Sequence, residues 1–229
     1  MPRLFLIPNS ISERGFDADP NAVSAIAHVR LFFVEGLKSA RRLLKQLNPD
    51  FPLQECLFLD YNEHTTSAQI KEYVPLLKAQ DSGIISESGC PCIADPGVDL
   101  VLAAHQHNMD IIPLIGPSSI VLALMASGLG GQNFAFNGYL SKDAKERAVK
   151  IKNLEKRAKQ EGQTQIVMEA PYRNQNVMDD LLAHLDVKTL LCVALDITGK
   201  AQFIRTKTMQ EWRNFNVPLP KKPALFIIK

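Results

Sequence analysis

The stretch GIISESGCPCIADPG, residues 83–97, joins a short apolar segment to a loop of glycine, proline, cysteine and acidic residues. Residues 83–85 have the composition of a buried strand, and residues 98–107 have the spacing of a helix. Strand, loop and helix in this order form the repeating unit of an α/β sheet. The loop itself suits one of three roles: a metal site, a redox-active cysteine pair, or a turn that holds a small molecule.

The same alternation of strand and helix runs through the first half of the chain. Strands are predicted at residues 4–7, 31–34, 56–59, 83–85 and 111–114, with helices at 20–28, 38–47, 67–77 and 98–107. Neighbouring parallel strands are joined by long crossover connections, which are usually helices like these. We therefore expect a mainly parallel sheet with helices on its faces.

The second half has a different pattern. After a helix at residues 118–127, the glycines of residues 128–131 predict a hinge between two halves. Further strands are expected at 134–137, 165–168, 190–195, 202–205 and 224–228, and helices at 143–160 and 174–185; strands 190–195 and 202–205 are close enough for an antiparallel hairpin. We expect two α/β domains, residues 1–116 and 117–229, the second with a mixed sheet.

Composition narrows the class of protein. With 229 residues and 46% apolar composition, the chain can bury a sizeable core. The apolar run near residue 5 is too short for a signal peptide, and no run approaches about 18 residues, so we expect a cytoplasmic protein that does not span a membrane and keeps its four cysteines as free thiols. The net charge of +2 requires no nucleic-acid partner, so such a partner must be argued from a local patch.

The cysteine spacing argues against the metal and redox roles. Zinc sites repeat a cysteine pair that is two to four residues apart, whereas Cys90 and Cys92 form one tight C-P-C. A thioredoxin-like pair needs two intervening residues. The chain also lacks the GxGxxG, GxxxxGK[ST] and GxSxG motifs. We expect no metal; the loop is best explained as a turn whose glycines let a ligand approach the backbone.

Seven segments, in the same order along the chain, resemble those of one known family. They are FFVEGLKSARRLLKQL (32–47), YNEH (61–64), SESGCPCIADPG (86–97), IPLIGPSSIVLALMASGL (112–129), FAFNGYLSKDAKER (134–147), VMEAPYRNQNVMDDL (167–181) and VALDITGKAQFIR (193–205). The third is similar to the SDAGTPxISDPG loop of the tetrapyrrole methylase superfamily, in the branch that methylates ribosomal RNA, the small-subunit ribosomal RNA cytidine 2′-O-methyltransferase I family. The resemblance covers nearly the whole chain.

The resemblance implies an S-adenosylmethionine-dependent methyltransferase and a homodimer, with two α/β domains and the cofactor in the cleft between them. By motif position it implies cofactor contacts from Gly89, Cys90, Pro91, Ile93, Ser118, Ser119, Met168, Pro223 and Ala224. Glycine and proline shape a tight turn around the ligand, and apolar side chains enclose an adenine. A helix N-cap is the alternative role for the two serines.

Several positions depart from the family pattern. The first loop reads PNSISERG where the family has P-T-P-I-G-N-L, Tyr172 replaces a histidine, and Asp196 lies near the place of the family's R-E. The substrate side has changed more than the cofactor loop. Two alternatives to ribosomal RNA methylation therefore stay open: a tetrapyrrole or other small acceptor, and a non-catalytic paralogue that binds S-adenosylmethionine or RNA.

Transfer to a ribose hydroxyl needs a proton acceptor, because the sulfonium activates only the methyl group. The candidates after predicted strands are Glu35, Glu63, His64, Glu87 and Glu169, each of which has helix capping or arginine pairing as an alternative role. We favour Glu169 because it lies between Met168 and Arg173, whose guanidinium suits a phosphate. On the substrate side we place Arg173, Glu87, His64, Lys142 and Arg147.

The local feature that favours binding to RNA is the segment of residues 142–159, which contains eight basic and three acidic side chains. On a helix they predict a face that follows phosphates. The alternative is a solvated helix with internal pairs such as Glu146 with Lys150. The leading hypothesis is a methyltransferase that acts on ribosomal RNA at a ribose 2′-oxygen.

Overall fold

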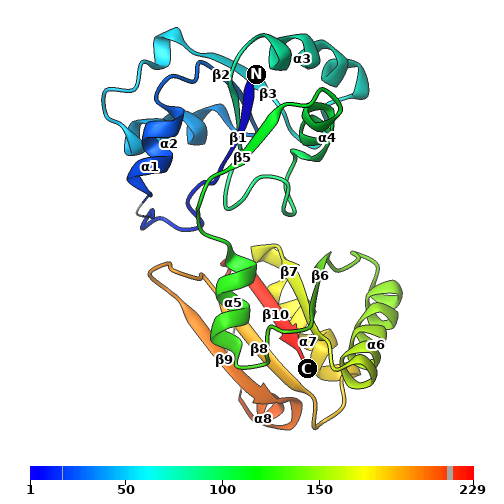
Figure 1. Ribbon diagram of the computed structural model, residues 1–229. Helices are drawn as coiled ribbons and strands as arrows, with labels where there is room; N and C mark the ends of the chain where they lie inside the picture. Colours follow the sequence, from blue (N-terminus) through cyan, green and yellow to red (C-terminus); the bar gives the residue numbers. More distant parts are fainter. Residues whose placement is uncertain (17, 216–218) are drawn as a thin grey trace. The chain divides into compact units, whose positions relative to one another are not determined.

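The computed structural model describes residues 1–16, 18–215 and 219–229. The chain folds as two compact units (Figure 1): residues 1–11 with 15–118, and residues 12–14 with 119–229. Each unit has its own five-stranded sheet and its own hydrophobic core.

The first unit is a parallel sheet in the order β3-β2-β4-β1-β5. Every strand and helix predicted for this half is present, with ends that differ by at most two residues. The elements are β1 (Arg3–Ile7), α1 (Pro20–Ile26), β2 (Leu31–Val34), α2 (Leu37–Leu47), η1 (Leu53–Glu55), β3 (Leu57–Asp60), α3 (Ser67–Ala79), β4 (Ser82–Ile85), α4 (Val98–Gln106) and β5 (Asp110–Pro113).

Alternate residues of β2 face opposite sides of this sheet. Phe32 and Val34 lie in a core with the buried residues of α1 and α2, while Leu31 and Phe33 lie in a second core with those of α3 and α4. A strand that is covered on both sides must be apolar throughout, which explains the unbroken run LFFV.

The second unit is a mixed sheet in the order β6-β7-β10-β8-β9. Strand β6 is parallel to β7, and the other pairs, including the predicted β8–β9 hairpin, are antiparallel. The elements are α5 (Ser119–Ser127), β6 (Phe134–Tyr139), α6 (Ala144–Glu161), β7 (Thr164–Glu169), η2 (Pro171–Arg173), α7 (Asn174–His184), β8 (Leu190–Leu195), β9 (Phe203–Thr208), α8 (Met209–Asn214) and β10 (Ala224–Ile228).

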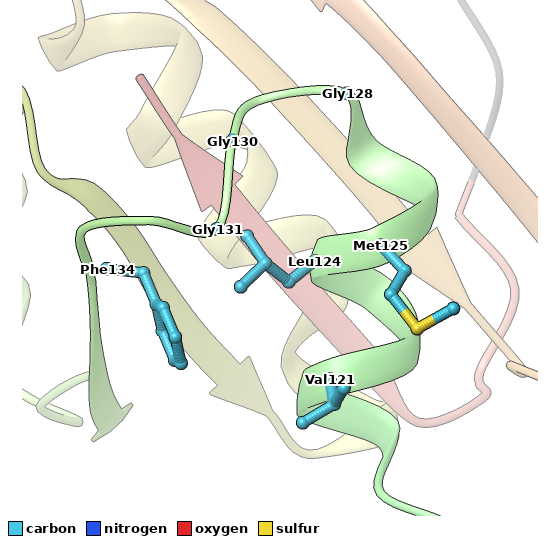
Figure 2. A pocket seen from close by; sticks show the side chains of 7 residues that line it. All are labelled: Val121, Leu124, Met125, Gly128, Gly130, Gly131 and Phe134. Carbon is cyan, nitrogen blue, oxygen red and sulfur yellow. The ribbon is translucent and has the colours of Figure 1, made fainter.

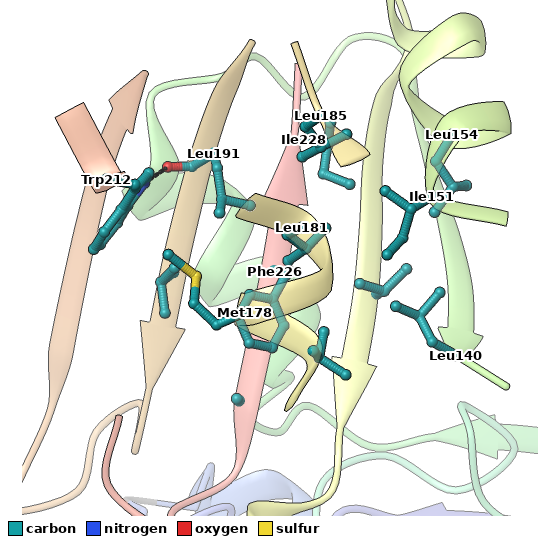
Figure 3. Close-up of a cluster of buried hydrophobic side chains, with 14 of the residues drawn as sticks. Leu140, Ile151, Leu154, Met178, Leu181, Leu185, Leu191, Trp212, Phe226 and Ile228 are labelled. Carbon is teal, nitrogen blue, oxygen red and sulfur yellow. Dashed lines mark hydrogen bonds between the residues drawn. The ribbon is translucent and has the colours of Figure 1, made fainter. Parts of the chain in front are cut away.

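The core of the second unit lies between one face of the sheet and helices α6, α7 and α8 (Figure 3). Ile151 and Leu154 point from α6 toward the sheet, where Phe226 of β10 is fully buried. Helix α5 packs against β8, β9 and β10. The sequence did not predict α8, since six residues show too little periodicity; the buried Trp212 anchors it by donating a hydrogen bond to the carbonyl oxygen of Leu191 at 2.8 Å.

The glycine run at residues 128–131 is not a hinge between the units. It lies inside the second unit, and Leu129 is buried. The Thr164 hydroxyl donates to the carbonyl oxygens of Leu129 and Gly130 at 2.8 and 2.9 Å. Gly128 and Gly130 have positive φ angles, so they supply turn geometry that leads from α5 into β6.

Within the described residues, we find no helix whose length and apolar character would let it cross a membrane.

The packing of the second unit predicts that alanine substitutions at Ile151 and Val149, both on α6, differ strongly in their effect on the free energy of unfolding. Ile151→Ala removes a fully buried side chain and should lower the free energy of unfolding by about 2–5 kcal/mol. Val149→Ala, at a side chain that is 60% exposed, should change it by less than about 0.5 kcal/mol. Trp212 is the only tryptophan, so its fluorescence during urea unfolding reports on this unit. Equal shifts for both variants would contradict the packing described here.

Candidate functional site

The loop of residues 86–97 is held in place by Asn9, which is separated from the end of the neighbouring strand β1 by Pro8. The backbones of Asn9 and Gly89 exchange two hydrogen bonds, at 2.8 and 3.1 Å. The Asn9 side chain also donates to the carbonyl oxygens of Ser86 and Glu87, at 3.1 and 3.0 Å. Asn9 is 3% exposed. Sequence reasoning did not assign it a role; its only signal is a polar residue immediately after a strand and a proline.

The segment after β5 approaches the same loops. A Cβ atom on Gly116 would lie 2.2 Å from the Cβ of Pro8, so only glycine permits this approach. The Cys90 thiol donates to the carbonyl oxygen of Pro117 at 3.4 Å. The segments that follow β4, β1 and β5 thus meet at the carboxyl edge of the sheet, where open α/β sheets bind ligands.

The second half of the loop is a tight turn with unusual backbone geometry. Cys92 and Ala94 have φ angles of 69° and 63°, a region that residues with side chains seldom occupy. Gly97 has a φ of 147°, and a Cβ atom there would lie 2.3 Å from the Cys92 sulfur. Non-glycine residues in such conformations cluster at functional sites. Ile93, between the two strained residues, is 51% exposed and presents an apolar side chain to solvent.

The two cysteines of the loop do not have the features of a metal ligand set or of a redox-active pair. Burial raises the pKa of both the Cys90 and the Cys92 thiols, and the charge of Asp95 raises them further, so both stay protonated. Among the residues that the structure describes, no group of three or more histidine, cysteine or acidic side chains is arranged to hold a metal ion.

Three carboxyl groups interact at this edge: Glu35 after β2, and Glu87 and Asp95 in the loop. Glu35 accepts a hydrogen bond from the backbone N–H of Glu87 at 2.8 Å. Burial, together with the charges of Glu35 and Glu87, raises the pKa of Asp95 to about 7. Asp95 can therefore exchange a proton near neutral pH. The two glutamates could be selected from the sequence, but Asp95 could not, because burial beside other acids is a tertiary property.

His64 and Glu63 lie elsewhere. They follow β3, at one end of the sheet, and β2 separates that strand from β4. Their side chains are 85% and 84% exposed, and the His64 Nε2 atom is 3.6 Å from a Glu63 carboxylate oxygen. Glu63 and His64 therefore do not join the group of carboxyl side chains at the loop of residues 86–97, whereas Glu35 and Glu87 do.

In the second unit, the residues assigned at the end of β7 lie together. Met168 and Glu169 pair with Leu225 and Ala224 of β10. Glu169 is 2% exposed; its Oε1 accepts from the Ala170 N–H at 2.8 Å. Its Oε2 lies 3.3 Å from the Arg173 guanidinium without hydrogen-bond geometry, and it is buried with no hydrogen-bond partner among the described residues. Glu169 therefore keeps one oxygen that can still accept a proton.

The two arginines placed on the substrate side hold the turn between β6 and α6. Arg173 donates to the carbonyl oxygens of Leu140 and Ser141, at 3.2 and 2.9 Å. Arg147 donates to those of Ser141 and Lys142, at 2.9 and 3.0 Å, and pairs with Asp180. Their side chains are only 12% and 10% exposed, so both guanidinium groups position backbone; Lys142 itself is exposed.

The remaining cofactor candidates lie at element ends. Ser118 is the last residue of the first unit, and Ser119 opens α5 in the second. The carbonyl oxygen of Pro223 accepts from the backbone N–H of Asp196 at 3.0 Å. Asn174, which is 1% exposed, donates to the carbonyl oxygens of Pro220 and Lys222 and so fixes the segment that leads into β10.

Comparison with known proteins gives a consistent result. The family model of the tetrapyrrole (corrin/porphyrin) methylases matches residues 20–212. The chain is 31% identical to the ribosomal RNA small subunit methyltransferase I of Synechocystis sp., over 98% of this chain and 78% of that protein. It is 28% identical to the protein of the same name from Vibrio cholerae, over 92% and 70%. The crystal structure of the methyltransferase CobJ superposes with a TM-score of 0.62 over 98% of this chain and 92% of that one; at 12% identity this likeness shows the fold alone.

The raised pKa of Asp95 predicts how stability depends on pH. The folded protein binds the Asp95 proton more tightly than the unfolded chain does. This group therefore lowers the free energy of unfolding as the pH rises from 3.8, the ordinary pKa of an aspartate, to about 7. Asp95→Asn removes that effect. The variant should be more stable than the wild type above about pH 8, and the difference should shrink toward zero near about pH 4.

Urea unfolding followed by circular dichroism at several pH values measures this difference. Glu63→Gln, at a side chain that is 84% exposed, is the control and should show little pH-dependent difference from the wild type. A stability gain for Asp95→Asn that is the same at low and high pH would contradict the raised pKa.

Proposed function

Because the chain belongs to the tetrapyrrole methylase family, and is thereby an S-adenosylmethionine-dependent methyltransferase, we propose that its acceptor is small-subunit ribosomal RNA, methylated at a ribose 2′-oxygen. The observation that carries the proposal is the 31% identity with a ribosomal RNA small subunit methyltransferase I over 98% of the chain. We place this activity in the cytoplasm.

The residues that we assign to the cofactor fit S-adenosylmethionine in their chemistry. In the first unit, the turn of residues 89–93 combines close backbone packing with the exposed side chain of Ile93, which suits an adenosine. The nearby carboxyl groups of Glu35, Glu87 and Asp95 favour a cation such as a sulfonium. In the second unit, Met168 and Ala224 lie on paired strands and offer a further apolar surface.

When bound, S-adenosylmethionine supplies an activated methyl group. The protein must then align the ribose hydroxyl and accept its proton. We propose Glu169 as the acceptor, with its Oε2 oxygen as the atom that takes the proton. Arg173, at 3.3 Å from that oxygen, holds the turn of residues 140–141 and orients the carboxylate. Lys142, exposed on the same turn, can approach a phosphate.

Asp95 is the second candidate for the proton acceptor. Its pKa of about 7 matches a base that works at neutral pH, because such a group is partly deprotonated and still binds a proton well. The two carboxyl groups differ in their partners: Glu169 lies beside a guanidinium, and Asp95 lies beside two other acids. Their substitution should therefore have different effects on the pH profile.

A specific observation weighs against the non-catalytic alternative. The altered first loop, PNSISERG, contains Asn9, whose side chain holds two carbonyl oxygens of the loop at residues 86–97. The departure from the family pattern thus leaves the proposed cofactor loop well supported. The tetrapyrrole or other small-acceptor alternative gains no support from the CobJ likeness, since that likeness extends to the fold only.

We also propose that the chain forms a homodimer, as the family resemblance implies. An apolar groove of about 590 Å³ lies between α5 and the start of β6 (Figure 2), lined by Val121, Leu124, Met125, Gly128, Gly130, Gly131 and Phe134. Met125 is 73% exposed and Val121 and Phe134 are 48% and 42% exposed. Apolar side chains that gather in this way favour burial against another surface, and a second copy of the chain would provide it.

The enzymatic proposal is tested by two substitutions. Glu169→Gln should lower methyl transfer to small-subunit ribosomal RNA by at least about a hundredfold, because the amide cannot take the proton. Binding of S-adenosylmethionine, measured by calorimetry, should be unchanged. If Glu169 is the base, the Asp95→Asn variant should retain methyl transfer. If Asp95 is the base, the variant should lose the rise in the rate of methyl transfer that the wild type shows through about pH 7.

Full transfer by both variants would contradict a carboxylate base at either position. A folded wild-type protein that binds no S-adenosylmethionine would contradict the proposed cofactor site, and one that binds it but methylates only a small acceptor would contradict the choice of RNA.

The dimer proposal predicts the effect of a charge in the groove. Met125→Glu should weaken self-association by about a hundredfold or more, since the carboxylate would be buried without a partner. Light scattering during gel filtration, across a dilution series, measures the mass. Val98→Glu changes another exposed apolar residue, 59% exposed at the start of α4, and should leave the mass unchanged. A dimer that persists in Met125→Glu would show that the groove is not the interface.

A further inference from the structure

Helix α6 has one narrow line of residues on the side opposite to its buried side. Its buried residues, Arg147, Ile151, Leu154 and Ala158, share one side of the helix. Ile151 and Leu154 point from that side toward the sheet (Figure 3). At 100° per residue, the opposite side carries Lys145, Val149, Lys152 and Lys156, with spacings of four, three and four residues. All four are exposed. We call these four residues the lysine stripe.

The three acidic residues of α6 are bound to groups outside the lysine stripe. Glu146 accepts from the Ser141 hydroxyl at 2.7 Å, and so does not pair with Lys150 as the sequence alone allowed. Glu155 accepts from the Asp186 N–H at 2.8 Å and pairs with Lys159 at 3.2 Å. Glu161 pairs with Arg157 at 3.6 Å.

The lysines of the stripe therefore keep their charges available. Across the described residues, no ion pair involves Lys145, Lys152 or Lys156. By the helical rise, the three ammonium groups are spread along about 16 Å, with the last two about 6 Å apart. Of the basic residues of α6 that are paired, Arg157 and Lys159 lie on the flanks of the helix, and Arg147 lies on its buried side. In the folded protein, some basic residues of the segment 142–159 are thus paired with acidic side chains, and the lysines of the stripe are not.

From this arrangement we propose that the lysine stripe is a docking surface for the phosphate backbone of RNA. The proposal rests on the proposed function, which supplies RNA as the substrate, and it adds the surface that holds the RNA. A row of free cations on a straight helix can contact several phosphates at once. The stripe carries no aromatic residue, so it contacts backbone and does not read bases.

An anionic membrane is the other surface that could attract these lysines. A helix that lies on a membrane buries a broad apolar face among the lipids. The outward line of α6 has Val149 as its one apolar residue, and the large apolar side chains Ile151 and Leu154 lie in the protein core. The observations therefore favour RNA.

The test compares two double variants on one helix. Lys152→Gln/Lys156→Gln removes two charges of the stripe, and Arg157→Gln/Lys159→Gln removes two charges that are already paired. Both lower the net charge by the same amount. The probe is a fragment of small-subunit ribosomal RNA, and the readout is the dependence of the binding constant on salt concentration.

The stripe variant should reduce the slope of log K against log salt by about two, one for each lost phosphate contact, while the control should reduce it by less than about half a unit. At saturating RNA, the control variant should transfer methyl groups at the wild-type rate. Circular dichroism and S-adenosylmethionine calorimetry should show both variants folded.

Equal slopes for the two variants, with a wild type that binds RNA, would overturn the stripe and leave the proposed function standing. A wild type that binds no RNA would overturn both. Loss of binding to phosphatidylserine vesicles by the stripe variant, without any loss of binding to RNA, would overturn the RNA assignment in favour of a membrane.

Discussion

The hydrogen bonds between Asn9 and the loop of residues 86–97 are the constraint on which the first unit's proposed site depends. They join positions 77 to 80 residues apart in the chain, because β1 and β4 are neighbours in the parallel sheet. This loop contains non-glycine residues at positive φ, each of which costs about 1 kcal/mol or more, so the loop needs contacts that hold it. Asn9 holds it by accepting and donating at the backbone and by donating from its side chain. The same loop continues into the strained turn, which contains the exposed Ile93 and, just after it, Asp95 with its raised pKa.

A related constraint orders the second unit. Arg147 and Arg173 converge on the carbonyl oxygens of residues 140–142 and thereby fix where α6 begins. Arg147 lies on the buried side of that helix, so the same interaction sets its rotation about its axis. The rotation decides which lysines face solvent. One buried guanidinium thus links the turn near Glu169 to the orientation of the lysine stripe.

Much of the fold could be predicted from the sequence, and the exceptions have physical causes. The run LFFV, apolar throughout, required a strand covered on both faces, and Asp19 with Pro20 marked a helix start that the structure contains. Helix α8 was missed because its stability comes from the burial of Trp212, which is a tertiary effect. The glycines at residues 128–131 were mistaken for a hinge because glycine signals a turn equally well inside a unit and between units.

The sequence by itself determined the order of the elements, the family, and the set of residue types that can serve a methyltransferase, since these depend on local periodicity and on motifs. The tertiary structure alone decided the state of each charged group. It raised the pKa of Asp95 by burying it beside Glu35 and Glu87, and it turned Arg147 and Arg173 toward backbone carbonyls. Within the part of the chain that the structure describes, it left Lys145, Lys152 and Lys156 without ion pairs. The reason is that electrostatic energies depend on distance and on burial, and neither quantity is encoded at any single position of the chain.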